Sequence, residues 1–398
     1  MPMSRVISQR SSLAFLVITV LTFLAASSAP TPLYQVYQEN LHFSAAMLTV
    51  IFGVYAVSLL AALLTVGSLS DHLGRKPVIF VALLLNIMAM VLFINADSTA
   101  HLIAARALQG FATGMATAVL SATLLDTDRV RGPMLNSLAP LLGMASGGLG
   151  SGLLVEFAPR PTQLIYFTLL GLMVLQAVYV WRLAETVSRI PGALKSLAPT
   201  LHVPRQARRA LWLVMPLNVA VWALGGFFSS LAPSLVKAAT GSTSHLIGGV
   251  LVAVVTLSGA VMIYSVRERP ADKIMRLSAG LLALGVALLL VAVHLGILWL
   301  FFVASVIAGF GFGGGFMGSV RSIVGLALPH ERAGLMSAFY VLSYLAFCLP
   351  ALLAGYLSHV YGLIVTTEGY GAALMVLALS ALVGLLVQDS VRAKAAIE

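Results

Sequence analysis

The sequence has 398 residues, of which 60% are hydrophobic and only 9% are charged. Soluble domains carry about 25% charged residues, so this composition excludes an ordinary soluble protein and indicates a chain that lies in lipid. The net charge of +10 would also suit a nucleic-acid-binding protein. We exclude that class because no soluble basic domain is available to carry the charge.

Apolar runs long enough to cross a bilayer recur along the whole chain. A spanning helix needs about 20 apolar residues at a rise of about 1.5 Å per residue. The chain contains twelve such runs, at residues 12–34, 44–66, 78–95, 99–124, 134–155, 163–181, 210–236, 244–265, 275–293, 296–320, 333–356 and 369–387. We therefore predict an all-α membrane protein with twelve transmembrane helices.

The first run follows Arg5 and Arg10, and small residues stand at positions 26–29 after its most apolar part. This arrangement also occurs in cleavable signal peptides, whose apolar core has about 7–15 residues. The run here is longer, so we interpret it as the first membrane helix.

The gap between the second and third runs carries the sequence G-S-L-S-D-H-L-G-R-K, which begins at Gly67. Gly67 lacks a side chain and would let another helix approach closely, whereas Gly74 permits a sharp turn. Asp71, Arg75 and Lys76 must lie at the membrane surface, because the gap is too short for a domain. Asp71 is suited to accept hydrogen bonds from the N-terminus of another helix.

This gap is also expected to interact with the end of the fourth run. Arg75 can pair with Asp126 or Asp128, which lie on the same membrane face. Such a network would hold one conformation closed, although a charged loop that only sets the topology is the simpler alternative. The predicted conformational latch consists of Gly67, Asp71, Gly74, Arg75, Lys76 and Asp126.

The fourth run contains the sequence L-I-A-A-R-A-L-Q-G-F-A-T-G at residues 102–114. Arg106 lies about two turns inside this run, where an arginine costs at least about 2.5–3.5 kcal/mol. It should therefore face a wet cavity or a polar partner. The alternatives are that it reaches the outer interface or pairs structurally with Glu39 or Glu156.

The residues that follow Arg106 divide into a polar face of the helix and a face of glycines without side chains, called the smooth face below. Gln109 continues the polar face and is a candidate for binding substrate or a coupling ion. Gly110 and Gly114 recur at a spacing of four residues and predict close helix packing.

The fifth run is also rich in glycine, with the sequence G-M-A-S-G-G-L-G-S-G at residues 143–152. Gly147, Gly148 and Gly152 predict tight packing against neighbouring helices. A flexible gating helix and a merely compact helix pair both explain this composition.

A polar segment at residues 183–209, which contains three prolines, divides the twelve runs into two sets of six. We predict an N-terminal six-helix bundle at residues 1–182, a cytoplasmic linker at 183–209 and a C-terminal six-helix bundle at 210–398. A weak internal repeat supports the division: residues 27–30 (S-S-A-P) resemble residues 229–233 (S-S-L-A-P). Likewise, the gap at 67–76 has a charged counterpart without glycines at 267–276.

The basic residues define the expected orientation, because Lys and Arg in short loops stay on the cytoplasmic side. If the N-terminus is inside, 20 of the 23 basic residues fall in inner segments. Only Arg160 and Lys237 fall in outer loops, and Arg106 falls inside a run. We expect both termini in the cytoplasm.

Polar or aromatic residues inside the runs are candidates for the wall of a substrate cavity. They are Tyr55 in the second run, Asn218 and Trp222 in the seventh, and Tyr344 in the eleventh. Aromatic residues in membrane helices also serve in packing and at interfaces, which is the alternative reading of each.

The acidic residues all fall in or near predicted loops, so no carboxylate lies near the bilayer centre. Proton coupling would then use Glu39, Glu156, a histidine or the substrate itself. Arg106 is the only deep charge, which suggests attraction of an anionic group. No catalytic motif, metal-ligand cluster or cofactor site is recognisable, and the single Cys348 excludes a disulfide within the chain.

The motif that begins at Gly67 and the Arg106–Gly110 spacing resemble signatures of the major facilitator superfamily, in particular of bacterial drug:proton antiporters. The glycine-rich fifth run resembles the antiporter signature only in part, since its usual proline is missing, and His72 stands where the family usually has arginine. The resemblance implies two pseudo-symmetric six-helix bundles that rock about a central cavity and clamp together through the latch loop. It implies a transporter and not an enzyme.

The expected function is proton-coupled efflux of drug-like or amphipathic small molecules, with no cofactor and with membrane lipid as the surroundings. Uptake or export of a small organic anion by means of Arg106 is the alternative, and a sensor without transport activity is a third. We expect a monomer in the bacterial cytoplasmic (inner) membrane, since a monomer suffices for this mechanism.

Overall fold

The computed structural model describes residues 8–199, 201–242, 244, 246–328 and 331–395, and all regular structure in them is helical. The α-helices are α1 (Gln9–Ser28), α2 (Pro30–Leu41), α3 (Ala45–Val66), α4 (Leu69–Leu73), α5 (Arg75–Ile94), α6 (Thr99–Thr127), α7 (Gly132–Phe157), α8 (Pro161–Tyr179), α9 (Arg205–Ser230), α10 (Ala232–Thr240), α11 (Leu246–Val266), α12 (Ala271–Leu295), α13 (Leu298–Val324), α14 (Arg332–Tyr361) and α15 (Leu363–Ala395). Two short 3-10 helices, η1 (Val180–Arg182) and η2 (Lys195–Leu197), follow α8.

Twelve helical segments of the described chain are long and apolar enough to cross a membrane, which confirms the predicted fold class. Some expected limits need correction: α9 begins at Arg205, inside the segment expected as linker (183–209), and the last segment begins at Leu363 and not at 369. Two further corrections concern helix breaks. The first segment extends over Gln9–Leu41 and consists of two helices, whereas a single run at 12–34 was expected. The seventh ends at Ser230, and the rest of the predicted run at 210–236 forms the start of α10.

Both corrections fall at the serine-rich segments of the internal repeat. The helix α1 ends at Ser28 and α2 starts at Pro30, while α9 ends at Ser230 and α10 starts at Ala232, next to Pro233. A proline has no N–H and disfavours continuation of the helix before it. The repeated motif therefore encodes a repeated helix break.

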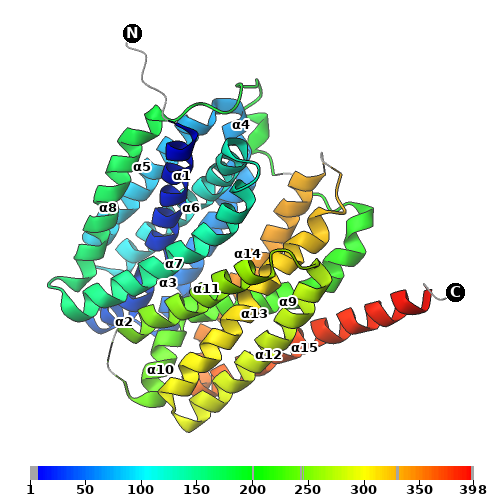
Figure 1. Cartoon of the computed structure of the whole chain (residues 1–398). Coiled ribbons are helices and arrows are strands. Elements are labelled where there is room, and N and C mark those ends of the chain that lie inside the picture. The colour runs from blue at the N-terminus through cyan, green and yellow to red at the C-terminus, as the bar shows by residue number, and fades with distance from the viewer. Residues whose placement is uncertain (1–7, 200, 243, 245, 329–330, 396–398) are drawn as a thin grey trace. The chain divides into compact units, whose positions relative to one another are not determined.

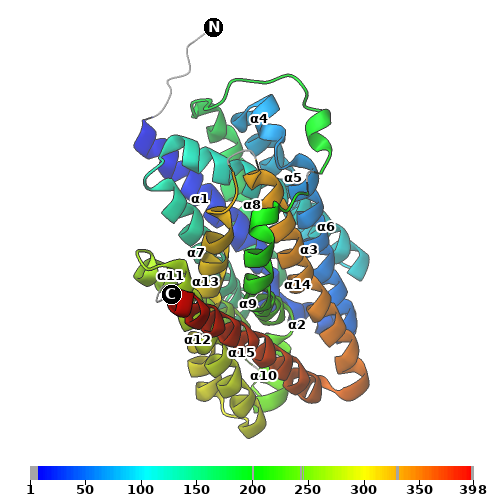
Figure 2. The same ribbon diagram turned by 90° about the vertical axis from the view of Figure 1, so that its right-hand side faces the viewer.

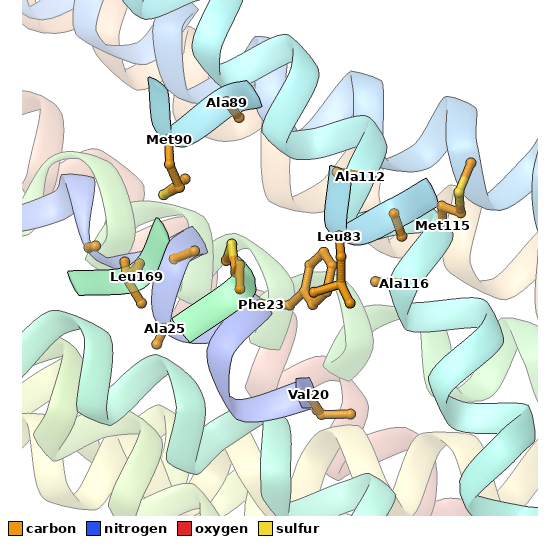
Figure 3. Close-up of a cluster of buried hydrophobic side chains, with 14 of the residues drawn as sticks. Val20, Phe23, Ala25, Leu83, Ala89, Met90, Ala112, Met115, Ala116 and Leu169 are labelled. Atoms are coloured by element: carbon orange, nitrogen blue, oxygen red, sulfur yellow. The ribbon is translucent and has the colours of Figure 1, made fainter. Parts of the chain in front are cut away.

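The chain forms two compact units, of which unit 1 comprises residues 1–200 and 244–253. In this unit α5 packs between α6 and α8, and α1 lies against α6 and α7 (Figure 1). The interior is apolar and is built from several helices at once. Figure 3 shows part of it, with Phe23 from α1, Leu83 from α5, Ala116 from α6 and Leu169 from α8.

Unit 2 comprises residues 201–243 and 254–398. Its α12 packs extensively on α13 and also on α15, and α10 lies beside both α12 and α15 (Figure 2). The helix α9 contacts α13, α14 and α15, so its side chains form much of the interior of this unit. The single cysteine, Cys348, is buried in α14.

Candidate functional site

Arg106 of α6 lies in the interior of unit 1, where it is only 2% exposed. Its Nη1 donates to the backbone oxygen of Ser27 at 3.1 Å and to Oε1 of Gln109 at 2.6 Å. The guanidinium also lies over the ring of Tyr55, with Cζ 4.2 Å from the ring centroid. Cation–π contact and hydrogen bonds together offset part of the cost of burying the charge. We call Arg106, Gln109, Tyr55 and Ser27 the arginine cluster.

The break between α1 and α2 supplies a hydrogen-bond acceptor to this cluster. In a continuous helix the carbonyl of Ala26 would accept from the N–H of residue 30, but Pro30 has none. The Nε2 of Gln109 donates to this carbonyl at 2.8 Å. The proline thus frees a buried oxygen, and the glutamine satisfies it while presenting its own oxygen to Arg106.

The arginine cluster retains unused hydrogen-bonding capacity. The Nε of Arg106 is buried without a partner, and so is the hydroxyl of Tyr34, whose ring centroid lies 6.0 Å from the guanidinium carbon. Within the described residues Arg106 forms no ion pair, including none with Glu39 or Glu156. The Nε–H of the guanidinium can therefore still donate to an acceptor that the protein does not supply.

The smooth face of α6 packs against α3. A Cβ atom added at Gly110 would collide with the carbonyl of Tyr55, and one added at Gly114 would collide with the carbonyl of Leu59. Because α3 also carries Tyr55, this close approach positions the ring that stacks on Arg106.

The second polar cluster lies between α4 and α5, around Arg75. This side chain is 8% exposed; its Nη1 pairs with Oδ1 of Asp71 at 2.6 Å, and its Nε pairs with Oδ2 of Asp126 at 3.1 Å. Asp128, the other expected partner, instead accepts from the backbone N–H groups of Val130 and Arg131. These bonds, with that of Arg131 the stronger, lower the pKa of Asp128.

Glu185, which follows α8, completes this cluster. Its Oε1 accepts from the backbone N–H of Arg75 at 2.7 Å, and its Oε2 accepts from that of Lys76 at 3.3 Å. Both N–H groups belong to the first turn of α5, where a helix lacks internal acceptors and favours negative charge. Asp71, Arg75, Asp126 and Glu185 are named the loop cluster below.

Two expectations about the gap differ from what is found. Asp71 was expected at the N-terminus of another helix, but it bonds Arg75, and Glu185 occupies a helix N-terminus instead. Gly67 was expected to admit another helix, but a Cβ there would meet the carbonyl of Leu63 from the preceding turn.

The segment after Glu185 also contacts the gap. The hydroxyl of Thr186 donates to Oδ2 of Asp126 at 3.0 Å, and Nδ1 of His72 lies 3.1 Å from the carbonyl of Ile190. Part of the expected linker is therefore attached to unit 1 by side-chain hydrogen bonds.

The third cluster lies in unit 2 and is aromatic. The ring of Trp222 in α9 has its centroid 4.8 Å from that of Tyr344, 5.8 Å from that of Phe316 and 5.9 Å from that of Phe347. These four residues, the aromatic cluster, are each only partly buried. The indole Nε1 of Trp222 is buried and has no hydrogen-bond partner.

Asn218, one turn before Trp222, takes a different part. Its Nδ2 donates to the hydroxyl of Ser343 at 2.8 Å, and the side chain is fully buried between α9 and α14. This bond joins α9 to α14, the two helices that carry Trp222 and Tyr344, so Asn218 helps to hold these two rings in place. Its Oδ1 has no partner.

The glycines of α7 lie on two faces of the helix. A Cβ at Gly147 would collide with Ala25 of α1, whereas a Cβ at Gly148 would lie 3.1 Å from Val252 in the first turns of α11. Gly152 likewise faces Gly249 and Leu246. The helix is therefore packed closely on both sides.

Sequence reasoning missed several members of these clusters. Phe316, Phe347 and the carbonyls of Ala26 and Ser27 carry no local signal, since only the packing of distant helices brings them into place. Glu185 did carry a local signal in the sequence, because it is the only acidic residue between positions 183 and 209.

Twelve apolar helical segments in the described part of the chain, with buried polar clusters, define a multi-pass helical membrane protein. The sequence profile of the Major Facilitator Superfamily matches residues 15–349. The chain belongs to this superfamily, whose members are transporters and not enzymes, as the sequence motifs predicted.

Curated relatives match part of the chain. The multidrug resistance protein MdtL of Klebsiella pneumoniae subsp. pneumoniae is 30% identical over 159 residues, which are 38% of this chain and 40% of the relative. MdtL of an Escherichia coli strain is 33% identical over 161 residues, or 39% of this chain and 40% of the relative. The match thus spans about two-fifths of the length of these relatives.

Two solved structures share the fold. The nucleoside transporter NupG has a TM-score of 0.74 at 12% identity, and it covers 95% of this chain and 100% of its own. The human organic anion transporter MFSD10 (TETRAN) has a TM-score of 0.66 at 17% identity over 94% of this chain and 100% of its own.

Proposed function

We propose that the protein exports drug-like or amphipathic small molecules across the bacterial inner membrane, with protons as the counter-ion. The aromatic cluster of unit 2 is the observation that carries this proposal. Partial similarity to MdtL, a multidrug resistance protein, supports the same class of cargo.

The chemistry of the aromatic cluster suits such molecules. Four partly buried rings offer flat apolar surface, and none of the four residues carries a charge at neutral pH. Stacking against ring faces tolerates many ligand shapes, because it depends little on directional bonds. The unpaired indole N–H of Trp222 adds one donor for an acceptor group on the ligand.

The proposed export works by alternating access, with both termini in the cytoplasm, and a monomer is sufficient. A proton gradient is the proposed energy source because the sequence has no nucleotide-binding motif. The acids available for coupling lie near the ends of the helices, as Glu39 and Glu156 do.

Transport into proteoliposomes tests the proposal. Cationic, neutral and anionic aromatic compounds would be offered with and without a proton gradient, to native protein and to variants. We expect uptake of cationic and neutral compounds that stops when the gradient is collapsed. Trp222→Ala should reduce it about tenfold, which corresponds to about 1.4 kcal/mol of lost stacking.

Trp212→Ala is the matched control, because Trp212 is 75% exposed and stands outside the aromatic cluster. Equal activity of the Trp222 and Trp212 variants would contradict a role of the cluster in cargo binding. Uptake that is unaffected by collapse of the gradient would contradict proton coupling.

Transport of a small organic anion is the second candidate, and the unpaired Nε–H of Arg106 favours it. Arg106 is only 2% exposed, so the anion would have to enter the arginine cluster in another step of the cycle. A response restricted to anionic compounds, lost in Arg106→Ala and kept in part by Arg106→Lys, would replace the first candidate by this one.

We further infer that the loop cluster acts as a conformational latch. It contains Arg75, a buried charge held by residues from separate segments of unit 1. If the loop set only the topology, Asp126→Asn would insert normally and transport at the native rate. A latch predicts normal insertion with a changed transport rate.

A further inference from the structure

An apolar groove runs between α5 and α8 in unit 1. It has a volume of about 460 Å³. Its lining consists of Phe80, Leu84, Ile87, Val174, Ala177, Val178 and Trp181. These side chains are all apolar or aromatic, and the indole N–H of Trp181 is the one hydrogen-bonding group among them, so the groove offers little to a polar cargo.

Positive charge gathers at one end of the groove. Lys76 lies one helical turn before Phe80 on the same face of α5, and its Nζ reaches the carbonyl of Leu183, two residues beyond Trp181. Arg182 follows Trp181 directly and is exposed. Neither Lys76 nor Arg182 forms an ion pair within the described part of the chain.

The acid at this end does not neutralise these cations. Both carboxylate oxygens of Glu185 accept backbone N–H groups of α5, where the positive end of the helix dipole compensates the charge. Lys76 and Arg182 therefore stay without a carboxylate ion pair at this end of the groove, within the described residues.

The groove has the polarity and the depth of a lipid site. From Phe80 to Ile87 it extends seven residues along α5, or about 10 Å into the apolar layer at about 1.5 Å per residue. Trp181 packs on Phe80 with ring centroids 5.2 Å apart, at the end where an amphipathic indole suits the membrane interface. The groove thus changes from cationic at one end to apolar along its length. A lipid with an anionic headgroup and an acyl chain has the same order of polarity.

We propose that the groove binds an anionic phospholipid, with its phosphate near Lys76 and Arg182 and one acyl chain between α5 and α8. A zwitterionic lipid fills the apolar part equally well, but it gains less from the two cations. Each cation near an anionic headgroup is worth about 1 kcal/mol, so we expect an anionic preference of about fivefold per cation.

Quenching of Trp181 fluorescence measures this preference. The protein has four tryptophans, and changing Trp212, Trp222 and Trp299 to phenylalanine leaves Trp181 as the only reporter. The full chain is reconstituted in mixed vesicles in which either phosphatidylglycerol or phosphatidylcholine carries brominated acyl chains. We expect stronger quenching by brominated phosphatidylglycerol, and loss of the difference in Lys76→Gln/Arg182→Gln.

A reporter at Trp212 separates the groove from surface charge alone. Trp212 is 75% exposed and follows Arg208 and Arg209, so it has neighbouring cations but lies outside this groove. Equal anionic preference at the two reporters would overturn the proposal, as would no preference at Trp181 or a preference that survives the double glutamine variant.

Filling the groove is an independent test. Val174 lines it and is 42% exposed, so Val174→Phe should occupy the acyl-chain space without disturbing the core. Leu175→Phe is the control, because Leu175 is 68% exposed and does not line the groove. We expect the anionic preference at Trp181 to fall in the first variant only, and equal behaviour of the two would contradict the proposal.

Discussion

Two charged segments occupy matching places between membrane helices, one with Arg75 in unit 1 and one with Arg276 in unit 2, yet they differ in burial. The side chain of Arg75 is 8% exposed and bonds Asp71 and Asp126. That of Arg276 is 26% exposed and bonds Asp272 on its own helix. Two related loops with net positive charge thus place one arginine in a buried network and the other in a more exposed position.

The difference lies in the partners that the surrounding chain provides. Unit 1 brings Asp126 from α6 and Glu185 from the segment after α8 to the start of α5. At the corresponding place in unit 2, α12 follows Pro270 without a side-chain cap. A loop becomes a rigid corner only when distant segments satisfy its charges and its backbone.

The largest effect is expected from removing Arg75. Arg75→Ala leaves Asp71 and Asp126 without their cation and should cost about 3 kcal/mol of stability, because the arginine is buried and bonded to two carboxylates. Arg276→Ala should cost less, because the side chain of Arg276 is 26% exposed and the Asp272 carboxylate that it bonds is 41% exposed. Apparent melting temperatures in detergent measure both, and equal shifts would contradict the contrast.

A somewhat smaller effect is expected at Gly74, which has a φ of +99°. A Cβ there would also lie 2.7 Å from Oε2 of Glu185. Gly74→Ala should therefore cost about 1–3 kcal/mol. A Cβ atom added at Gly280 in α12 would have nothing within 4 Å, so Gly280→Ala is the control and should be neutral or stabilising. Thermal denaturation in detergent is again the measurement. If Gly280→Ala were destabilised as much as Gly74→Ala, the cost at Gly74 could not be attributed to its backbone conformation and its contact with Glu185.

The smallest of the three effects is expected at Glu185. Glu185→Gln keeps an acceptor at the N-terminus of α5 but removes the charge, at a cost of about 0.5–1 kcal/mol. Glu268→Gln is the comparison in unit 2, where the carboxylate is 85% exposed beside Arg267 and should contribute almost nothing. Limited proteolysis of the segment after α8 checks the first variant, since losing the cap should speed cleavage there and not elsewhere.

The sequence predicted what depends on helix ends and on one helix face. Arg75 lies just before the third run and Asp126 just after the fourth, on the same membrane side, so their pairing could be expected. Gln109 lies three residues after Arg106 on the same helix, so their contact could be expected too. The acceptor that Pro30 frees could not be found, because it requires knowing that α1 packs against α6 at that height.

The same limit applies to unit 2. Trp222 and Tyr344 were each candidates, but their contact depends on how α9 and α14 are rotated against each other. Hydropathy fixes which segments enter the membrane, whereas the rotation and height of each helix depend on packing that no single segment encodes.

The absence of a carboxylate beside Arg106 in the described residues has an electrical consequence. Its partners are a carbonyl, an amide and a ring, so a full positive charge stays in the spanning part of unit 1. One elementary charge that crosses the whole membrane gains or loses about 2.3 kcal/mol per 100 mV. Any step that shifts α6 along the membrane normal should therefore be voltage-dependent, and turnover measured in vesicles held at different diffusion potentials should reveal it.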